Sequence, residues 1–226
     1  MRSKQPSLFS INNIVLLVTS LIATFIFYQL AILVLNHEIG KFDDRGYFIV
    51  RQYASPFVDK LMLWATFLGD TKFVLIPVVG LFIYNTFIHP HKWDAIKVLV
   101  ISIGCTAINT ALKYLFGRER PLHDHMVEVS NLSFPSGHAM FSMAFYGAVI
   151  YFVTKGNQKP IIKIGMTAFL VVLILSIGIS RVYLGVHYTS DVVAGFAAGY
   201  IWLVAVLVVT DWLALKVGGD NWLQGN

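Results

Sequence analysis

Charged residues are scarce in this chain. Asp, Glu, Lys and Arg together make up 13% of its 226 residues, against 57% for hydrophobic residues, whereas an ordinary soluble domain carries about 25% charged residues. This composition excludes an ordinary soluble globular protein and indicates an integral-membrane protein. A single domain spanning residues 1–226 accounts for the length.

Cysteine is almost absent, and the basic residues form no block. Cys105 is the sole cysteine and lies in an apolar stretch, so an intrachain disulfide is excluded and a small buried hydrophobe is expected. The net charge is +5, but the 17 Lys and Arg are scattered between apolar runs without the basic face of a nucleic-acid binder. We therefore expect no nucleic-acid partner and attribute the basic excess to anionic lipid surfaces or a phosphate-bearing substrate.

Long apolar runs dominate what is present. A bilayer core about 30 Å thick requires roughly 20 apolar residues per helix, and six segments qualify. The expected spans are 11–35, 71–88, 93–116, 138–154, 161–180 and 191–216. The first is much longer than the about 7–15 residues of a signal-peptide core, so a retained transmembrane helix is expected there. The predicted fold is all-α: a polytopic membrane protein with six transmembrane helices.

A long connection, residues 36–70, separates the first two spans. Its second half, 56–68, places Val58, Leu61 and Met62 at near-helical spacing. Two interpretations are open for this half. It is either an interfacial amphipathic helix that lies beside the membrane or a helix that packs over the bundle.

The distribution of basic residues predicts the orientation. With six spans both ends of the chain share one side of the membrane, and the connections 116–138 and 180–191 lie together on the other. Short segments on the terminal side carry Arg2, Lys4, Lys92, Lys155, Lys159, Lys163 and Lys216, where acids are sparse. Because cytoplasmic segments are enriched in Lys and Arg, the two connections and their motifs are expected on the non-cytoplasmic face.

Ionisable residues crowd the junction between the last two spans. The stretch 180–191 carries Arg181, His187 and Asp191, and such groups are costly near a membrane, which points to a function. If the last span is helical from about Val186 onward, His187 and Asp191 lie on one face of its first turn. The carboxylate would then hold one imidazole nitrogen as N–H and leave the other free to attack.

A second cluster ends the third span. Lys113 lies in its last turn, Gly117 is expected to stop the helix, and Pro121 prevents its continuation. Arg120 stands directly before that proline. This cluster adds two cations to the same side of the membrane.

A third cluster opens the fourth span. Ser136 is expected to cap the helix, Gly137 admits a ligand close to the backbone, and His138 follows. The free N–H groups of a helix start point at an anion. Together the three clusters suit a tetrahedral oxyanion gripped by cations, with one histidine as nucleophile and the other as general acid.

The three clusters, in this order, resemble the signature of a known family. Lys113-x6-Arg120-Pro121, Pro135-Ser136-Gly137-His138 and Ser180-Arg181-x5-His187-x3-Asp191 are similar to the three-part signature of the type 2 phosphatidic acid phosphatase (PAP2) and vanadium haloperoxidase superfamily. The six-helix layout resembles its integral-membrane lipid phosphatase branch. No signature position departs from the family pattern.

The resemblance implies a role for each signature residue. His187 would attack phosphorus and form a phosphohistidine, Asp191 would orient it, and His138 would protonate the leaving oxygen. Lys113, Arg120, Ser136, Gly137 and Arg181 would bind the phosphoryl oxygens. The branch works without a metal ion, so neither a metal site nor a cofactor is expected.

The resemblance also implies a substrate class and a location. The expected partners are a membrane lipid phosphate and the lipid bilayer, with no obligate protein partner, in a multi-pass protein of a bacterial plasma membrane. The expected substrate is phosphatidylglycerophosphate, giving phosphatidylglycerol, and undecaprenyl diphosphate is the alternative. Two other classes stay open: a lipid-phosphate transporter or binding protein, and a vanadate-dependent peroxidase.

Several polar residues lie outside the signature. Arg118 is expected to reach solvent or lipid headgroups. His123, Asp124 and His125 are expected in a solvated loop, with headgroup contact as the alternative. The sequence His89-Pro90-His91 is interpreted as a polar turn, because its proline and short spacing suit a turn better than a metal site.

Overall fold

The computed structural model describes residues 11–88, 92–129 and 132–218. All regular structure within these ranges is helical. The elements are α1 (Ile11–Leu35), α2 (Gly40–Arg51), α3 (Pro56–Leu68), α4 (Thr71–Ile83), η1 (Tyr84–Ile88), α5 (Lys92–Phe116), α6 (Gly137–Lys155), α7 (Pro160–Tyr183) and α8 (Thr189–Gly218). The predicted all-α fold is confirmed. The expected turn at His89–His91 and the basic residues Arg2 and Lys4 lie outside the described residues.

Five helices of the described chain are long and apolar enough to cross a membrane. They are Ile14–Leu35, Lys92–Phe116, Gly137–Lys155, Pro160–Tyr183 and Thr189–Ala214. A sixth span is obtained when Pro56–Leu68 and Lys72–Ile88 are taken together, joined at an angle of 44°. The span expected at 71–88 therefore reaches membrane-spanning length only together with α3.

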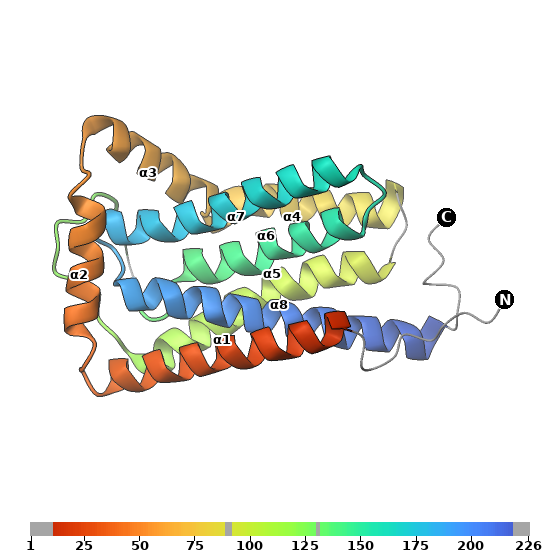
Figure 1. Ribbon diagram of the computed structural model, residues 1–226, viewed down its shortest axis with the longest axis horizontal. Coiled ribbons are helices and arrows are strands. Elements are labelled where there is room, and N and C mark those ends of the chain that lie inside the picture. The colour runs from red at the N-terminus through yellow and green to blue at the C-terminus, as the bar shows by residue number, and fades with distance from the viewer. Residues whose placement is uncertain (1–10, 89–91, 130–131, 219–226) are drawn as a thin grey trace.

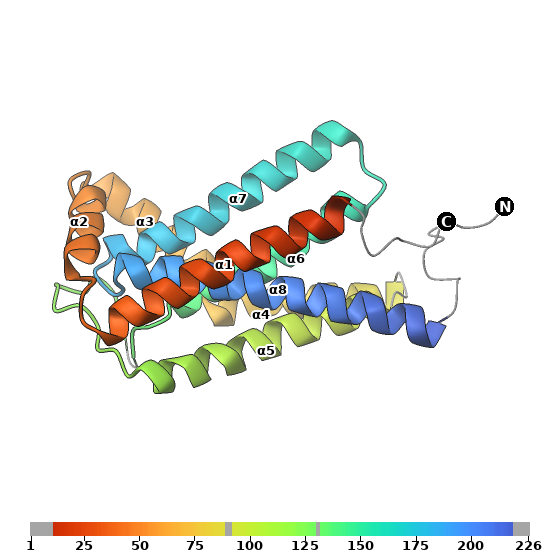
Figure 2. The same ribbon diagram turned by 60° about the horizontal axis from the view of Figure 1, so that its bottom comes forward.

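The long helices run side by side as a bundle with α6 and α8 at its centre (Figures 1 and 2). α6 packs against α5, α7 and α8, and α1 packs along α8. Two helix backbones approach closely at Gly199, where a Cβ atom would lie 2.3 Å from the carbonyl oxygen of Met140 on α6. Small residues allow such backbone contact between membrane helices, so Gly199 brings α8 directly against α6.

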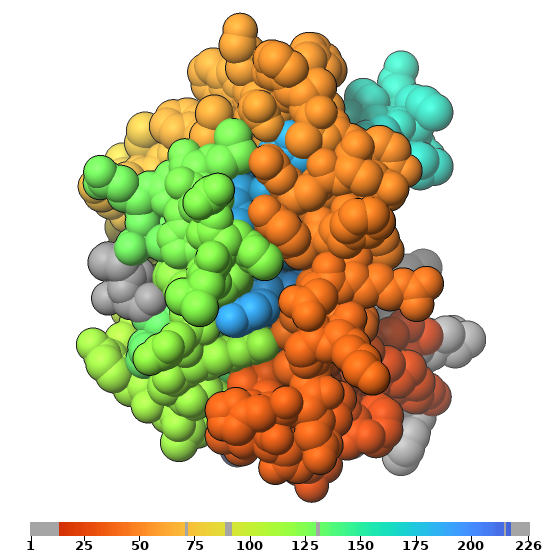
Figure 3. All heavy atoms as spheres, turned by 90° about the vertical axis from the view of Figure 1, so that its left-hand side faces the viewer, coloured from red at the N-terminus to blue at the C-terminus, as the bar shows by residue number. Residues whose placement is uncertain are grey.

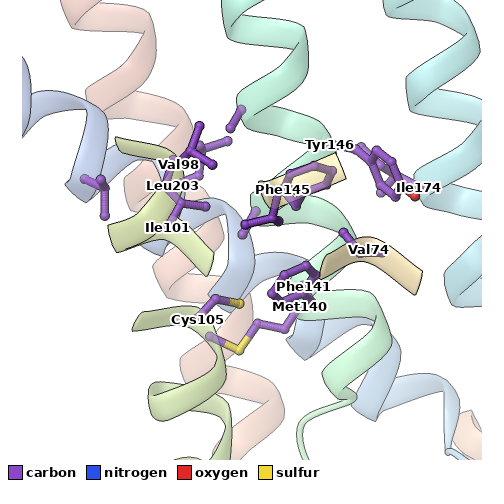
Figure 4. Close-up of a cluster of buried hydrophobic side chains, with 14 of the residues drawn as sticks. Val74, Val98, Ile101, Cys105, Met140, Phe141, Phe145, Tyr146, Ile174 and Leu203 are labelled. Atoms are coloured by element: carbon purple, nitrogen blue, oxygen red, sulfur yellow. The ribbon is translucent and has the colours of Figure 1, made fainter. Parts of the chain in front are cut away.

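Bulky apolar side chains fill the space between the helices. Val74 of α4, Ile101 of α5, Phe145 of α6, Ile174 of α7 and Leu203 of α8 belong to one buried cluster (Figure 4). Cys105 joins the same cluster at 1% exposure, as expected for a small buried hydrophobe.

The outer surface of the bundle is also apolar. On α1, for example, Leu17, Leu21 and Phe25 are each at least 60% exposed. Large apolar side chains that face outward along a whole helix suit lipid rather than water. The surface therefore agrees with the membrane-spanning character of the helices.

The connection between the first two spans forms two helices, α2 and α3. α2, which the sequence did not predict, lies across one end of the bundle, and α3 returns obliquely along α7 (Figure 1). Ser55 caps α3 by accepting the backbone N–H of Val58 at 3.3 Å, and Pro56 occupies the first turn. Val58 and Met62 pack against the end of α7. α3 therefore packs against the bundle, as one of the two expectations for 56–68 has it. Its position relative to the membrane stays a prediction.

The three signature clusters lie at the end of the bundle that α2 covers. Figure 3 views this end: α2 and the 117–136 connection flank a narrow gap in which atoms near the α7–α8 turn are visible. Lys155 and Lys159 lie at the α6–α7 connection, at the opposite end of the bundle. The predicted grouping of the connections 116–138 and 180–191 at one end is confirmed.

Candidate active site

His187 lies in the tight turn between α7 and α8. The turn is closed by the backbone N–H groups of Val186 and His187, which both donate to the carbonyl oxygen of Arg181 at 3.2 Å. α8 begins at Thr189, so the expectation of a helix from about Val186 is wrong, because the chain between the helices is used to form this turn. His187 is 3% exposed and Asp191 is fully buried.

Asp191 nevertheless reaches His187 from the first turn of α8. Its Oδ2 atom accepts the backbone N–H of Tyr188 at 3.0 Å and lies 3.4 Å from Nδ1 of His187. A side chain in the first turn that accepts the N–H just before the helix satisfies one of the donors left open at a helix start. The same carboxylate thus starts the helix and holds the imidazole.

Ser133 completes the contacts on this side of the ring. Its hydroxyl donates to Oδ2 of Asp191 at 2.5 Å, and its oxygen lies 3.3 Å from Nδ1 of His187. Because the hydroxyl proton goes to Asp191, the serine oxygen can only accept from the imidazole. Both neighbours of Nδ1 are therefore acceptors, which favours a proton on Nδ1.

The other imidazole nitrogen faces a cation. Nη1 of Arg120 lies 3.2 Å from Nε2 of His187 and donates to the carbonyl oxygen of Val186 at 2.6 Å. A guanidinium can only donate, so Nε2 must present its lone pair. The contacts on both sides of the ring thus agree on the Nδ1–H tautomer, with a nucleophilic nitrogen directed at Arg120.

The protonation state supports a nucleophile. Burial lowers the pKa of His187 to about 3; Asp191 opposes this shift, and the positive charges of Arg181 and Arg120 add to it. The imidazole is therefore neutral at physiological pH. A neutral imidazole has the free lone pair that an attack on phosphorus requires.

Two further cations of the signature lie in the last turns of their helices, at the same end of the bundle as His187. Lys113, in the last turn of α5, donates to the carbonyl oxygen of Leu132. Arg181, in the last turn of α7, is 4% exposed and donates through Nη1 to the hydroxyl of Thr66, while its buried Nε atom has no hydrogen-bond partner among the described residues. A buried donor without a partner is costly, so this guanidinium is suited to an anionic ligand.

The remaining signature residues open α6. Ser136 is the N-cap, as expected, and accepts the N–H of Ala139 at 3.5 Å, while its own N–H donates to the carbonyl oxygen of Asp191 at 2.9 Å. Gly137 and His138 follow in the first turn. These contacts dock the start of α6 on the start of α8.

His138 interacts electrostatically with charged residues of the other two clusters. Arg181, His187, Arg120 and Lys113 all act on it electrostatically. The residues that the sequence assigned to one site from separate helices are therefore neighbours in space. Their arrangement brings a neutral imidazole, a second histidine and three cations to the same end of the bundle.

Three residues of this region were not identified from the sequence as site residues: Ser133, Arg118 and Asp43. Arg118 was expected to reach solvent or headgroups, which is wrong. Its guanidinium donates to Oδ1 of Asp191 at 2.6 Å and to Oδ2 of Asp43 at 2.7 Å, and its side chain is 15% exposed. The sequence signal available was its position two residues before Arg120.

Both histidines of the 121–129 loop contact other residues of the protein. His123 stacks on Tyr47 of α2 with ring centroids 3.8 Å apart, and Nε2 of His125 lies 2.9 Å from the carbonyl oxygen of Pro121. Asp124 and His125 are exposed, as expected for a solvated loop. Within the described residues, His, Cys, Asp and Glu form no group of three or more that could hold a metal ion.

Known proteins share both the sequence and the fold. The PAP2 superfamily profile matches residues 94–214. Phosphatidylglycerophosphatase B of Bacillus subtilis is 34% identical over 160 residues, which cover 68% of this chain and 74% of that protein. Lipid A 1-phosphatase of Rhizobium etli is 32% identical over 143 residues, covering 58% of this chain and 57% of that protein.

A solved structure extends the likeness to most of the chain. The crystal structure described as the first transmembrane PAP2 type phosphatidylglycerolphosphate phosphatase, from Bacillus subtilis, superposes with a TM-score of 0.74 at 27% identity, covering 89% of this chain and 98% of that one. Profile, relatives and fold agree with the signature resemblance. The chain belongs to the PAP2 superfamily, among its membrane-embedded lipid phosphatases.

Proposed function

We propose that this protein removes the terminal phosphate of a membrane lipid phosphate through a phosphohistidine on His187. The observation that carries the proposal is the state of that imidazole. Asp191 and Ser133 hold Nδ1 as N–H, and the Nε2 lone pair faces Arg120 at 3.2 Å. The phosphate of a substrate would replace this resting contact and bring phosphorus to Nε2.

In the first step, the Nε2 lone pair forms the N–P bond while the bond from phosphorus to the lipid oxygen breaks. The positive charge that develops on the imidazole is balanced by Asp191, 3.4 Å from Nδ1. His138 would donate its proton to the leaving oxygen, so that the lipid departs as an alcohol.

The cations would hold the phosphoryl oxygens during transfer. Arg120, Arg181 and Lys113 supply positive charge, and Ser136 with the backbone N–H of Gly137 supplies neutral donors at the start of α6. The Nε atom of Arg181, which has no hydrogen-bond partner within the part of the chain that the structure describes, would donate to such an oxygen. These fixed charges replace what a metal ion would otherwise provide, and we propose that hydrolysis is metal-independent.

In the second step, water attacks phosphorus and the N–P bond breaks, which regenerates neutral His187. His138, having given up its proton, would accept one from the attacking water. Inorganic phosphate then leaves with the enzyme in its starting state. Each turnover consumes one water and needs no other co-reactant.

The preferred substrate in this proposal is phosphatidylglycerophosphate, with phosphatidylglycerol as the product. The similarity to phosphatidylglycerophosphatase B of Bacillus subtilis over 74% of its length supports this choice. Undecaprenyl diphosphate is the second candidate. The likeness to a lipid A 1-phosphatase adds lipid A 1-phosphate to the substrates worth comparing. In each case the phosphate would enter at the α2 end of the bundle while the tails stay against its apolar outer surface.

The orientation is part of the proposal. Lys92, Lys155 and Lys159 lie at the bundle end opposite the site, and short basic segments favour the cytoplasmic side. The site would then face the non-cytoplasmic side of a bacterial plasma membrane.

The test is phosphate release by purified protein in detergent, with the three lipid phosphates and phosphatidate compared at equal concentration. His187→Ala is expected to lower kcat by at least about 10³-fold, and the exposed His125→Ala serves as the matched control. Phosphate release by His187→Ala at the parent rate would refute the mechanism. Lipid transport that persists in His187→Ala without phosphate release would favour the transporter class. Peroxidase activity induced by vanadate would favour the peroxidase class.

A further inference from the structure

A carboxylate from outside the signature is buried at the start of α8. Asp43, in the first turn of α2, is 2% exposed. Its Oδ1 accepts the backbone N–H of Ser190 at 2.8 Å, and its Oδ2 accepts the hydroxyl of Ser190 at 2.9 Å. The first N–H groups of a helix have no partner within the helix. Asp43 therefore caps α8 from another helix, where a local side chain would normally do so.

Arg118 joins this cap to the candidate catalytic carboxylate. Its Nη2 donates to Oδ2 of Asp43 at 2.7 Å, and its Nη1 donates to Oδ1 of Asp191 at 2.6 Å and to the hydroxyl of Ser190 at 2.8 Å. The guanidinium also lies 3.9 Å above the ring of Tyr188. The planar fork of an arginine fixes such partners in direction as well as distance. One cation is thus held between two carboxylates.

The two oxygens of Asp191 have different partners as a result. Oδ1 is held by Arg118, and Oδ2 faces the N–H side of His187. Rotation of the carboxylate would break the contact with Arg118. Arg118, which belongs to a different part of the chain, therefore adds to the backbone N–H of Tyr188 in fixing the direction in which Asp191 presents Oδ2.

We propose that Arg118 and Asp43 act together as positioning residues for His187, Arg118 by fixing Asp191 and Asp43 by fixing Arg118 and the start of α8. The inference rests on the proposed phosphohistidine mechanism. Charge alternates along the series Asp43, Arg118, Asp191, so the positive charge of the guanidinium also offsets the repulsion between the two buried carboxylates. Arg118 differs in this from Arg120, whose guanidinium faces Nε2 of His187.

An ion pair at the opposite end of the bundle provides a control. Nζ of Lys97 lies 2.8 Å from Asp211 on α8; the lysine side chain is 6% exposed and the aspartate side chain 44%. Like the Arg118 pairs, it joins helices across the bundle. Asp211→Asn therefore reports what the loss of an interhelical ion pair outside the candidate site does to stability.

The experiment compares Arg118→Gln, Asp43→Asn and the double variant with the parent and with Asp211→Asn. Phosphate release from phosphatidylglycerophosphate in detergent gives kcat and KM, and thermal unfolding of the same samples gives Tm. We expect kcat to fall about 10- to 100-fold in either single variant, with KM within about threefold, because the phosphate-binding residues are intact. The kcat of the double variant should be no lower than that of the less active single variant, since the effects of residues that act as a unit are not additive.

Two further variants cover the case in which loss of a charge prevents folding. Ser190→Ala removes a hydroxyl bonded to both Asp43 and Arg118 but keeps the capped backbone N–H, and it should lower kcat about 3- to 10-fold. Arg118→Lys should restore part of the loss seen in Arg118→Gln, because it keeps the charge without the fork. Asp211→Asn should lower Tm and leave kcat near the parent value.

The outcomes separate this inference from the proposed function. Additive losses in the double variant, a rise in KM in place of a fall in kcat, or an unchanged kcat in Arg118→Gln and Ser190→Ala would each overturn the positioning role. The proposed function stands even when the positioning role fails, provided that the parent releases phosphate and His187→Ala does not. If His187→Ala is as active as the parent, the proposed function fails, whatever Arg118 does.

Discussion

Asp191→Asn is expected to lower kcat by about 10³-fold without changing the tautomer of His187. The amide oxygen must take the place of Oδ2, because the backbone N–H of Tyr188 donates there at 3.0 Å and is fixed by the chain. The NH2 group then replaces Oδ1 and faces Arg118, which is also a donor. Arg118 can withdraw while it keeps its bond to Asp43. The imidazole therefore keeps an acceptor beside Nδ1.

The lost charge sets the size of the effect. Attack on phosphorus leaves a positive charge on an imidazole whose Nδ1 lies 3.4 Å from Oδ2 of Asp191. At an effective dielectric constant of about 20, two unit charges at this separation attract by about 4–5 kcal/mol. Since about 1.4 kcal/mol corresponds to a factor of ten in rate, loss of the carboxylate charge corresponds to about 10³-fold or slightly more.

The assay is steady-state phosphate release at saturating lipid phosphate in detergent at pH 7. Asp211→Asn is the control, because it removes a carboxylate from the same helix at the far end of the bundle. Tm values of both variants show whether each is folded at the assay temperature. A kcat for Asp191→Asn within about tenfold of the parent would refute the electrostatic reasoning.

Three other predictions concern pH, metal ions and orientation. Thermal stability is expected to fall as pH drops from about 6.5 toward 4, because the unfolded chain binds a proton at His187 that the native state, with a pKa of about 3, does not; an equally steep fall in the Tm of His187→Gln would contradict this. Phosphate release is expected to persist in EDTA and to be inhibited by vanadate, and loss in EDTA with recovery on adding Mg²⁺ would show a metal requirement. Leu122 is fully exposed beside the site and Cys105 is buried, so a membrane-impermeant maleimide should label Leu122→Cys from outside intact cells, and labelling only after lysis would reverse the proposed orientation.

The signature could be read from the sequence because its residues sit at helix ends. Lys113 and Arg181 end apolar spans, and Ser136 begins one. A cation or cap at the edge of a long apolar run stands out, and the spans themselves follow from composition.

The residues that support the signature carry no such signal. Asp43 is followed by Asp44 and Arg45 in a polar stretch, and nothing in that pattern tells which acid is buried. α2 was not predicted, because this stretch is charged and carries Gly40 and Gly46, which disfavour a helix. Ser133 and Arg118 are recognisable only through contacts between residues 58 and 73 positions apart in the chain. Such contacts follow from tertiary packing, which local patterns do not specify.

The contacts of α8 have a consequence for biosynthesis. The start of this helix receives Asp43 from α2, Arg118 from the chain after α5 and the N–H of Ser136 from α6. Every one of these partners precedes α8 in the chain, and so does His187. A ribosome working from the N-terminus therefore delivers Asp191 to the membrane after all the groups that it must join. A nascent chain that stops before this last helix carries the cations proposed to bind phosphate but lacks the carboxylate that holds the proposed nucleophile. Phosphatase activity should therefore appear only when α8 has been inserted.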